Sequence, residues 1–161
     1  MTDANVFGSR WDFSRGGVNL ASVTKDAGGQ LLGATVYELE PGARWANLHA
    51  HYANEELIVV LDGRLTLHSL DGSRELERGA VVVCPRGRRG AHRVENTSDE
   101  LSRVLIISTM NMPELVEYPE QDRVFVMTEP PYSEGLHDAE EHGRILRVFS
   151  RSEGQPVPPD V

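Results

Sequence analysis

The residues best able to do chemistry lie in one short segment, HAHYANEE, which runs from His49 to Glu56. His49 and His51 are two residues apart, so on a β-strand both imidazoles leave the same face, with their roots roughly 6.6 Å apart. Side chains at that spacing can converge on one ion, with metal–nitrogen bonds of about 2.0–2.1 Å. The pair therefore predicts a metal site rather than two unrelated surface histidines.

Two carboxylates follow these histidines after a brief turn. Only one of Glu55 and Glu56 can face the histidines, because adjacent strand residues point to opposite sides. Glu56 shares its parity with Ile58 and Val60, so it would lead a row of residues that faces the interior. Glu56 is the predicted ligand, and Glu55 is the alternative.

His92 opens a later short strand and is a candidate fourth ligand. Three neutral imidazoles and one carboxylate would leave a divalent ion at formal +1, and a six-coordinate ion would keep two open positions. Open positions are typical of a catalytic metal rather than a structural one. We expect one divalent ion, but these ligand types do not choose among Fe, Mn, Ni, Zn, Co and Cu.

The elements that would position these ligands are short strands, because apolar runs are brief and turn signals recur about every 8 to 12 residues, as in antiparallel sandwiches and barrels. Asp62-Gly63 and Asp71-Gly72 are hairpin signals, with residues 64–70 as the return strand of the run 56–61. Further strands are expected at residues 18–23, 31–40, 45–51, 75–78, 81–84, 92–95, 104–108, 124–127 and 145–149.

Length and charge narrow the class of protein. A chain of 161 residues fits one domain, and its net charge of −9 would repel a nucleic-acid backbone. No apolar run approaches the ~20 residues that span a bilayer, and the polar start is not a signal peptide. Cys84, the single cysteine, cannot form an internal disulfide. We expect a cytosolic protein without nucleic-acid or membrane partners, in which Cys84 is a small buried residue or, alternatively, a reactive or ligating thiol.

The chemistry-bearing residues resemble the two sequence motifs of the cupin superfamily. The first motif is matched by Gly42, His49, His51, Glu56 and Gly63, and the second by Gly79, Pro85, Gly87, His92 and Asn96. Two gaps, from Gly42 to His49 and from Gly87 to His92, are longer than in the usual pattern, by one and two residues. The resemblance covers residues 31–110 and is closest to compact, single-domain bacterial cupins.

The resemblance implies a jelly-roll barrel with a metal near one mouth, held by His49, His51, Glu56 and His92. The single domain 1–161 would comprise an N-terminal arm over 1–28, a barrel core over 29–112 and a C-terminal extension over 113–161. Such cupins commonly pair as homodimers. The expected function is a metal-dependent enzyme, oxygenase- or isomerase-like, that acts on a small organic molecule. The alternatives are a non-catalytic binding or sensor protein and a metal-free structural barrel.

Other side chains are weaker candidates. Trp45 and Asn47 share the histidine face and could line a pocket, while Tyr37 is open between pocket and packing. His68 would face the cavity if its leucine neighbours face outward, and otherwise lies on the surface. The arginines of PRGRRGAH are expected to pair with surface acids, with an anionic ligand as the alternative. His137 and His142 are expected to be solvated loop residues.

Overall fold

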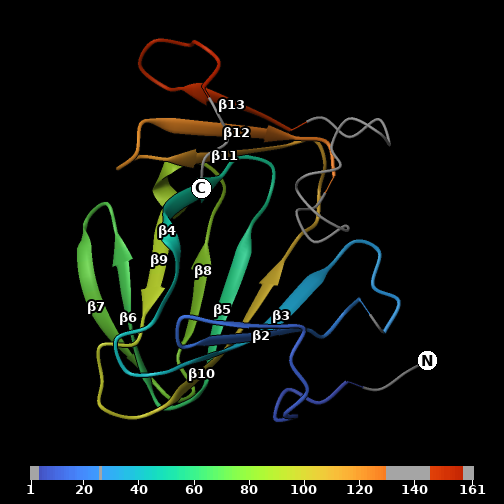
Figure 1. The fold of residues 1–161 in the computed structure, drawn as a ribbon, viewed down its shortest axis with the longest axis vertical. Coiled ribbons are helices and arrows are strands. Elements are labelled where there is room, and N and C mark those ends of the chain that lie inside the picture. Colours follow the sequence, from blue (N-terminus) through green and yellow to red (C-terminus); the bar gives the residue numbers. More distant parts are fainter. Residues whose placement is uncertain (1–3, 26, 130–145, 158–161) are drawn as a thin grey trace.

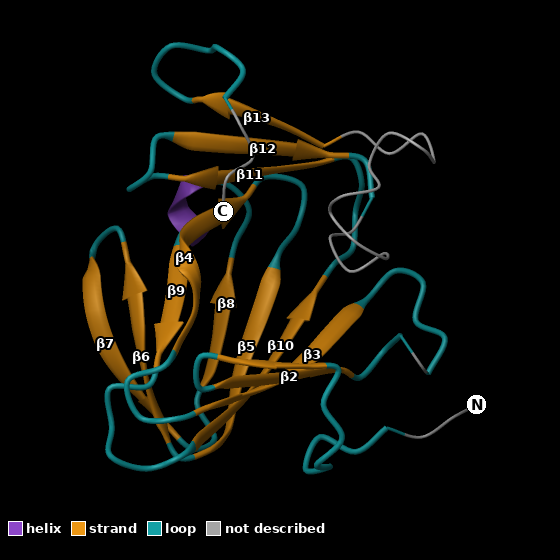
Figure 2. Ribbon diagram, in the orientation of Figure 1, coloured by secondary structure: helices purple, strands orange, loops and turns teal. Residues whose placement is uncertain are grey.

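Two antiparallel sheets form the fold (Figure 1). The computed structural model describes residues 4–25, 27–129 and 146–157. Within these ranges the only helical segment is one 3-10 turn, η1, and the rest of the regular structure is β-strand (Figure 2). The elements are β1 Phe13–Arg15, β2 Val18–Ser22, β3 Gly33–Leu39, β4 Arg44–His51, β5 Glu56–Asp62, β6 Arg64–Ser69, β7 Gly72–Glu77, β8 Val81–Cys84, η1 Arg88–Gly90, β9 His92–Glu95, β10 Ser102–Ser108, β11 Glu114–Tyr118, β12 Arg123–Met127 and β13 Leu146–Ser150.

The order of strands is that of a jelly roll. One sheet has the order β1-β2-β3-β10-β5-β8, and the other has the order β13-β12-β11-β4-β9-β6-β7. Between β3 and β10 the chain passes from one sheet to the other at every step except β6 to β7. This interleaving confirms the predicted all-β jelly-roll barrel. It also explains how ligands that are distant in the sequence come to face one another.

The predicted hairpin at Asp62-Gly63 is wrong. β5 pairs with β8 and β10, whereas β6 pairs with β7 and β9, so this turn carries the chain across to the other sheet. Gly63 has φ 72°, and a Cβ there would lie 2.6 Å from the carbonyl oxygen of Leu101. A turn signal specifies a local reversal, while burial of the strand faces decides which strands pair. The hairpin predicted at Asp71-Gly72 is confirmed, because Ser69 pairs with Gly72.

The core lies between the two sheets and is built from alternate residues of each strand. On β5, Ile58 and Val60 are fully buried, while Leu57 and Val59 are partly exposed. The parity assigned to the row that begins at Glu56 is therefore confirmed. Each aliphatic side chain buried in this way contributes about 1.5–3 kcal/mol. The buried cluster comprises Val18, Leu20, Tyr37, Leu39, Ala43, Ile58, Val60, Leu65, Leu67, Leu76, Cys84, Val94, Val104 and Ile106.

A bulge interrupts the strand that carries the histidine pair. Trp45 pairs with Val94 and His49 pairs with His92, so four steps along β4 oppose two steps along β9. Ala46 has φ 58°, in the left-handed region that non-glycine residues rarely adopt. The strict alternation expected over residues 45–51 therefore fails between Trp45 and His49. Bulges of this kind re-aim the side chains that follow them.

The segment that follows the barrel adds strands beside the histidines. β11 pairs with β4, where Val116 lies opposite His51, and β12 and β13 continue the sheet outward across one end of the barrel (Figure 1). β12 and β13 lie where strands were expected, but β11 was not predicted. Val116, Phe125 and Val148 form a second hydrophobic cluster on one face of these strands. His137 and His142 lie outside the described residues.

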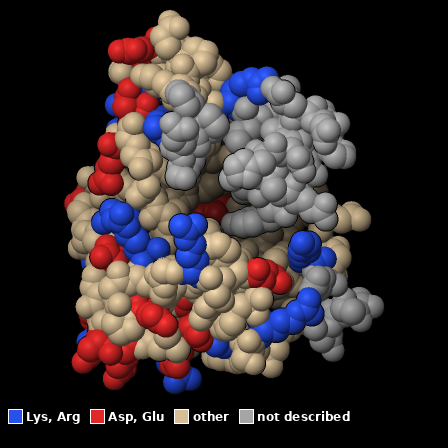
Figure 3. Space-filling model, viewed as in Figure 1, with Lys and Arg blue, Asp and Glu red and all other residues tan. Residues whose placement is uncertain are grey.

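Charged side chains of both signs are interspersed over the face drawn in Figure 3. Near the N-terminus, the Arg103 guanidinium lies over the rings of Phe7 and Trp11 and forms an ion pair with Glu38. These contacts attach the segment before β1 to the outer face of the six-stranded sheet. Among the described residues, no helix has the length and apolar character needed to cross a membrane.

Candidate metal centre

Three of the predicted ligands meet where β4 ends and β5 begins. One ligand atom each from His49, His51 and Glu56 lies within 4.8 Å of the other two. His92 lies beside them, with its Nε2 atom 2.9 Å from Oε2 of Glu56 and its side chain almost fully buried. Nε2 of His51 is 3.6 Å from the same Glu56 oxygen. The four side chains proposed from the sequence are therefore gathered in one place inside the barrel.

Main-chain carbonyls orient two of the imidazoles. Nδ1 of His49 lies 2.8 Å from the carbonyl oxygen of Asn47, and Nδ1 of His92 lies 2.9 Å from that of Gly90. A carbonyl oxygen can only accept a hydrogen bond, so Nδ1 carries the proton in both rings. The Nε2 atom of each ring is then directed to the shared site, as in histidines that bind metals.

The protonation states of His49 and Glu56 suit a cation. Burial, together with the nearby imidazoles of His92 and His51, lowers the pKa of His49 to about 3, so this ring is neutral near pH 7. Burial alone would raise the pKa of Glu56, but the hydrogen bond from His92 and the adjacent histidines lower it to about 2. Burial would lower the pKa of His92, but the Glu56 carboxylate and the neighbouring Cys84 outweigh it and raise that pKa, so Nε2 of His92 would give up its proton when a cation binds.

The donor set fits a divalent ion. Neutral imidazole and carboxylate are ordinary ligands of first-row divalent metals. In addition, Nδ1 of His51 is buried and makes no hydrogen bond in the described structure. A histidine that binds a metal through Nε2 usually donates its Nδ1–H to a nearby acceptor, and Nδ1 of His51 has none within hydrogen-bonding distance. His49, His51, Glu56 and His92 are the residues that would hold the ion.

Cys84 lies next to this centre. It pairs with Glu56 across β5 and β8 and belongs to the buried hydrophobic cluster. The prediction of a buried, unpaired cysteine is confirmed.

Sequence reasoning missed Glu114, a buried carboxylate behind His51. Its Oε2 atom lies 3.6 Å from Nδ1 of His51, and its side chain is 2 % exposed. No strand was predicted at residues 114–118, so nothing placed Glu114 near the site. The one available signal was the alternation in Glu-Leu-Val-Glu-Tyr just after Pro113.

Tyr118 was also missed. Its ring stacks on that of His49, with centroids 5.8 Å apart and planes 28° apart, and it also contacts the ring of Phe125. Glu114, Val116 and Tyr118 alternate along β11 and share one face. That face of the C-terminal segment therefore adjoins the metal-site histidines.

The weaker pocket candidates lie in different places. The rings of Tyr37 and Trp45 are 4.9 Å apart, and both pack in the hydrophobic cluster of the barrel. Asn47 contributes its main-chain carbonyl to His49. His68 lies on the face of β6 opposite the buried leucines, where it contacts Ser73 at 2.7 Å and Glu95 at 3.1 Å. The structure therefore does not bring His68 to the metal site.

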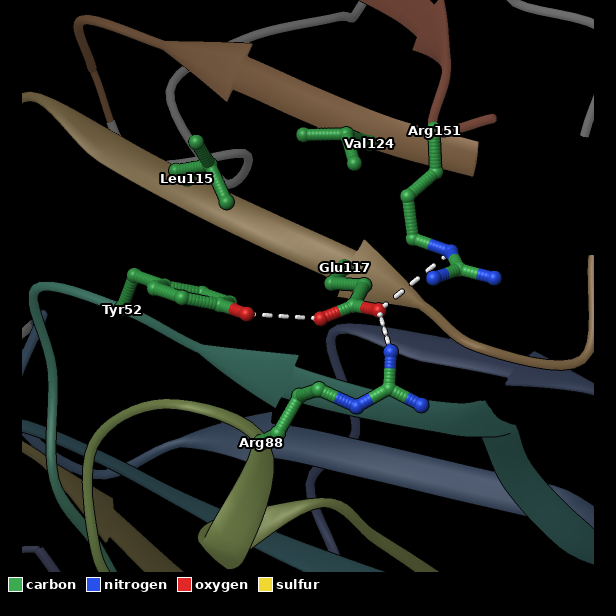
Figure 4. Close-up of a pocket in the computed structure, with 6 residues that line it drawn as sticks. All are labelled: Tyr52, Arg88, Leu115, Glu117, Val124 and Arg151. Carbon is green, nitrogen blue, oxygen red and sulfur yellow. Dashed lines mark hydrogen bonds and ion pairs between the residues drawn. The ribbon is translucent and has the colours of Figure 1, made fainter. Parts of the chain in front are cut away.

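A small pocket of about 360 Å³ lies on the other face of β11 (Figure 4). Its centre is Glu117, a buried carboxylate that accepts a 2.7 Å hydrogen bond from the hydroxyl of Tyr52. Arg88 and Arg151 both form ion pairs with Glu117, at 2.5 and 3.5 Å. The arginine cluster was expected to pair with surface acids, whereas Arg88 pairs with a buried one. These contacts link η1 and the residue that follows β4 to the C-terminal strands.

Comparisons with known proteins agree with this fold. The sequence profile of the cupin domain matches residues 35–108, which include all four candidate ligands. A sugar phosphate isomerase of the cupin superfamily from Silicibacter pomeroyi is 23% identical, with a TM-score of 0.71 over 89% of this chain and 82% of its own. A protein of Acidithiobacillus ferrooxidans, proposed to have the same activity, is 20% identical, with a TM-score of 0.72 over 88% and 81%.

A third structure is an oxalate decarboxylase predicted for Thermotoga maritima. It is 23% identical, with a TM-score of 0.51 over 57% of this chain and 79% of its own. No curated protein matches the sequence. At these identities, the likeness to solved structures shows the shared fold.

Proposed function

Since the chain belongs to the cupin superfamily, we propose that it is a metal-dependent enzyme acting on a small organic molecule inside the barrel. The observation that carries the proposal is the convergence of His49, His51, Glu56 and His92 on one buried point. A bound divalent ion would supply a Lewis acid that polarises a carbonyl or hydroxyl of the substrate.

Isomerisation is the first reaction class to test. Two structurally similar proteins carry sugar phosphate isomerase descriptions, which makes small phosphorylated sugars the first substrate class. Within this chain, the low pKa of His49 keeps its imidazole neutral, and Glu56 stays ionised, so both can bind a cation at physiological pH. Oxygenase-like chemistry is the second class, because the same ligands suit iron.

The experiment begins with metal content. Elemental analysis of protein purified without added metal is compared with a His49→Ala variant. Circular dichroism shows whether that variant keeps its fold. Metal in the wild type that is lost in a folded variant supports the proposal, and no metal in wild type reconstituted with each candidate ion contradicts it.

Activity is then tested with the metal-loaded protein. NMR follows aldose–ketose interconversion across a panel of sugar phosphates, and oxygen uptake is measured with diols, β-diketones and hydroxy acids. Turnover that disappears in His49→Ala supports an enzyme. Saturable binding without turnover would instead support a binding protein.

We also propose that the chain forms a homodimer through the outer face of β10, β5 and β8. Val81 and Val83 are 59 and 53 % exposed, and their cross-strand neighbours extend an uncharged apolar surface. Two copies that each carry a charge of −9 would meet with least repulsion on such a face. The surface consists of Leu57, Val59, Val81, Val83, Leu105 and Ile107.

Light scattering after size exclusion tests this arrangement. Val83→Asp should give a monomer, whereas Leu70→Asp, at an exposed turn, should leave the dimer intact. A monomeric wild type at tens of micromolar would contradict the proposal. Cytosolic location and the lack of nucleic-acid or membrane partners remain predictions from the sequence.

A further inference from the structure

His51 lacks the orienting contact that His49 and His92 have. Nδ1 of His49 and of His92 each lies within 3 Å of a main-chain carbonyl oxygen. Nδ1 of His51 is buried and makes no hydrogen bond, and Oε2 of Glu114 lies 3.6 Å from it. His51 therefore needs an acceptor, and Glu114 lies in the right place to be one.

Glu114 is itself held firmly. Its Oε1 atom accepts hydrogen bonds from the main-chain amides of Tyr52, Ala53 and Leu115, at 2.9 to 3.0 Å. Its Oε2 atom accepts one from the side-chain amide of Asn54. Three of these donors belong to the loop that joins His51 to Glu56. One carboxylate from β11 thus fixes the connection between two candidate ligands.

We propose that Glu114 is a positioning residue of the metal centre: it accepts a hydrogen bond from Nδ1–H of His51 and so turns the Nε2 lone pair toward the ion. This inference rests on the proposed metal binding and adds to it. Nε2 of His51 already points to the Glu56 oxygen, 3.6 Å away, so the ring has the required direction. A small rotation would bring Nδ1 to hydrogen-bonding distance of Glu114.

Such a contact has a known physical effect. A carboxylate behind a ligand histidine fixes its tautomer and raises its basicity, and loss of such a partner typically weakens metal binding about 10–100-fold. Glu114 lies in the C-terminal segment rather than in the barrel motifs. The inference therefore gives that segment a direct part in the metal site.

A matched control lies on the same strand. Glu117 is as deeply buried as Glu114, but it faces the other side of β11, and its partners are Tyr52, Arg88 and Arg151. Glu117→Gln removes one buried charge from β11 without touching a histidine. Glu114→Gln removes one that faces His51.

The test measures Zn²⁺ affinity by competition with a chelator, in wild type and both variants. We expect Glu114→Gln to bind Zn²⁺ about 10–100-fold more weakly and Glu117→Gln to match the wild type. Nitrogen-15 NMR of the histidine rings shows which nitrogen of His51 carries the proton, and a general loosening of the fold would not change this. His51 should carry its proton on Nδ1 in the metal-free wild type, and this preference should weaken in Glu114→Gln.

Each outcome of these measurements supports or overturns the role of Glu114. Equal Zn²⁺ affinity in wild type and Glu114→Gln, or a His51 ring protonated on Nε2 in the metal-free wild type, overturns the inference. If Glu114→Gln does not fold, Glu114→Asp keeps the charge but withdraws it from His51, and it should still weaken Zn²⁺ binding. A wild type that binds no Zn²⁺, Mn²⁺, Fe²⁺, Co²⁺, Ni²⁺ or Cu²⁺ contradicts the proposed function itself, while the NMR result still decides whether Glu114 accepts a hydrogen bond from His51.

Discussion

Nε2 of His92 lies 2.9 Å from Oε2 of Glu56, and the two residues come from opposite sheets of the barrel. The pair joins β9 to β5 across the interior. It also joins the two sequence motifs, which are far apart along the chain. Removal of either partner would leave a buried charge without its counter-charge, which typically costs about 3–5 kcal/mol.

The pH dependence of stability follows from this pair. Because folding lowers the pKa of Glu56, the ionised carboxylate stabilises the fold at pH values above 4.5, its ordinary pKa. This contribution is lost as pH falls toward about 2. Because folding raises the pKa of His92, the protonated ring stabilises the fold at pH values below 6.5, its ordinary pKa. This contribution is lost as pH rises through the pKa that His92 has in the folded protein. The unfolding free energy of chelator-treated wild type should therefore exceed that of Glu56→Gln most between pH 4.5 and 6.5. Urea unfolding across a pH series measures the difference, and a difference independent of pH would refute the ion pair.

Substitutions of His92 and His68 should distinguish a histidine of the metal site from a histidine on the surface. His92→Ala should lower the bound metal per chain sharply, because it removes a buried candidate ligand. His68→Ala should leave it unchanged, because His68 contacts Ser73 and Glu95 on the outer face of β6. Elemental analysis of both variants makes the comparison. Equal metal loss in the two would show that histidine content, rather than position, governs uptake.

The ion pairs and the hydrogen bond of Glu117 should contribute to stability. Glu117→Ala would leave Arg88, Arg151 and the Tyr52 hydroxyl without their shared acceptor (Figure 4). Because both guanidinium groups are nearly half exposed, water can replace the lost contacts, and we expect a destabilisation of about 1–3 kcal/mol. Chemical denaturation measures it. A variant as stable as wild type would show that these ion pairs contribute nothing.

The crossing between the sheets should not tolerate a side chain at Gly63. Gly63→Ala places a Cβ 2.6 Å from the carbonyl oxygen of Leu101 and also forces a positive φ on alanine. Gly42→Ala is the control, since Gly42 has a similar φ of 79° but no atom within 4 Å of such a Cβ. We expect a loss of about 1 kcal/mol at Gly42 and a larger loss at Gly63. Thermal unfolding of the two variants distinguishes steric overlap from backbone strain.

Local sequence patterns predicted what depends on local geometry. The two-residue spacing of His49 and His51, and the parity of Glu56 with Ile58 and Val60, predicted that these three side chains face one another, as the structure shows. The fold followed from the motifs and the rhythm of the turns. These features are visible because alternation of side chains is a property of a single strand.

What escaped prediction depends on pairing between distant strands. Asp62-Gly63 was read as a hairpin, because a turn signal does not say which sheet receives the next strand. Glu114 could not be placed, since its role exists only through the pairing of β11 with β4. The bulge after Trp45 likewise arises from register with β9 rather than from any residue type.

The pairing of β11 with β4 bears on how related proteins are compared. The cupin profile ends at residue 108, six positions before Glu114, so it covers the candidate ligands but not the carboxylate and aromatic ring that lie behind them. Two chains with identical liganding residues can thus differ in how tightly they retain an ion. The cause of such a difference should be sought in whatever each chain places beside the strand of its histidine pair.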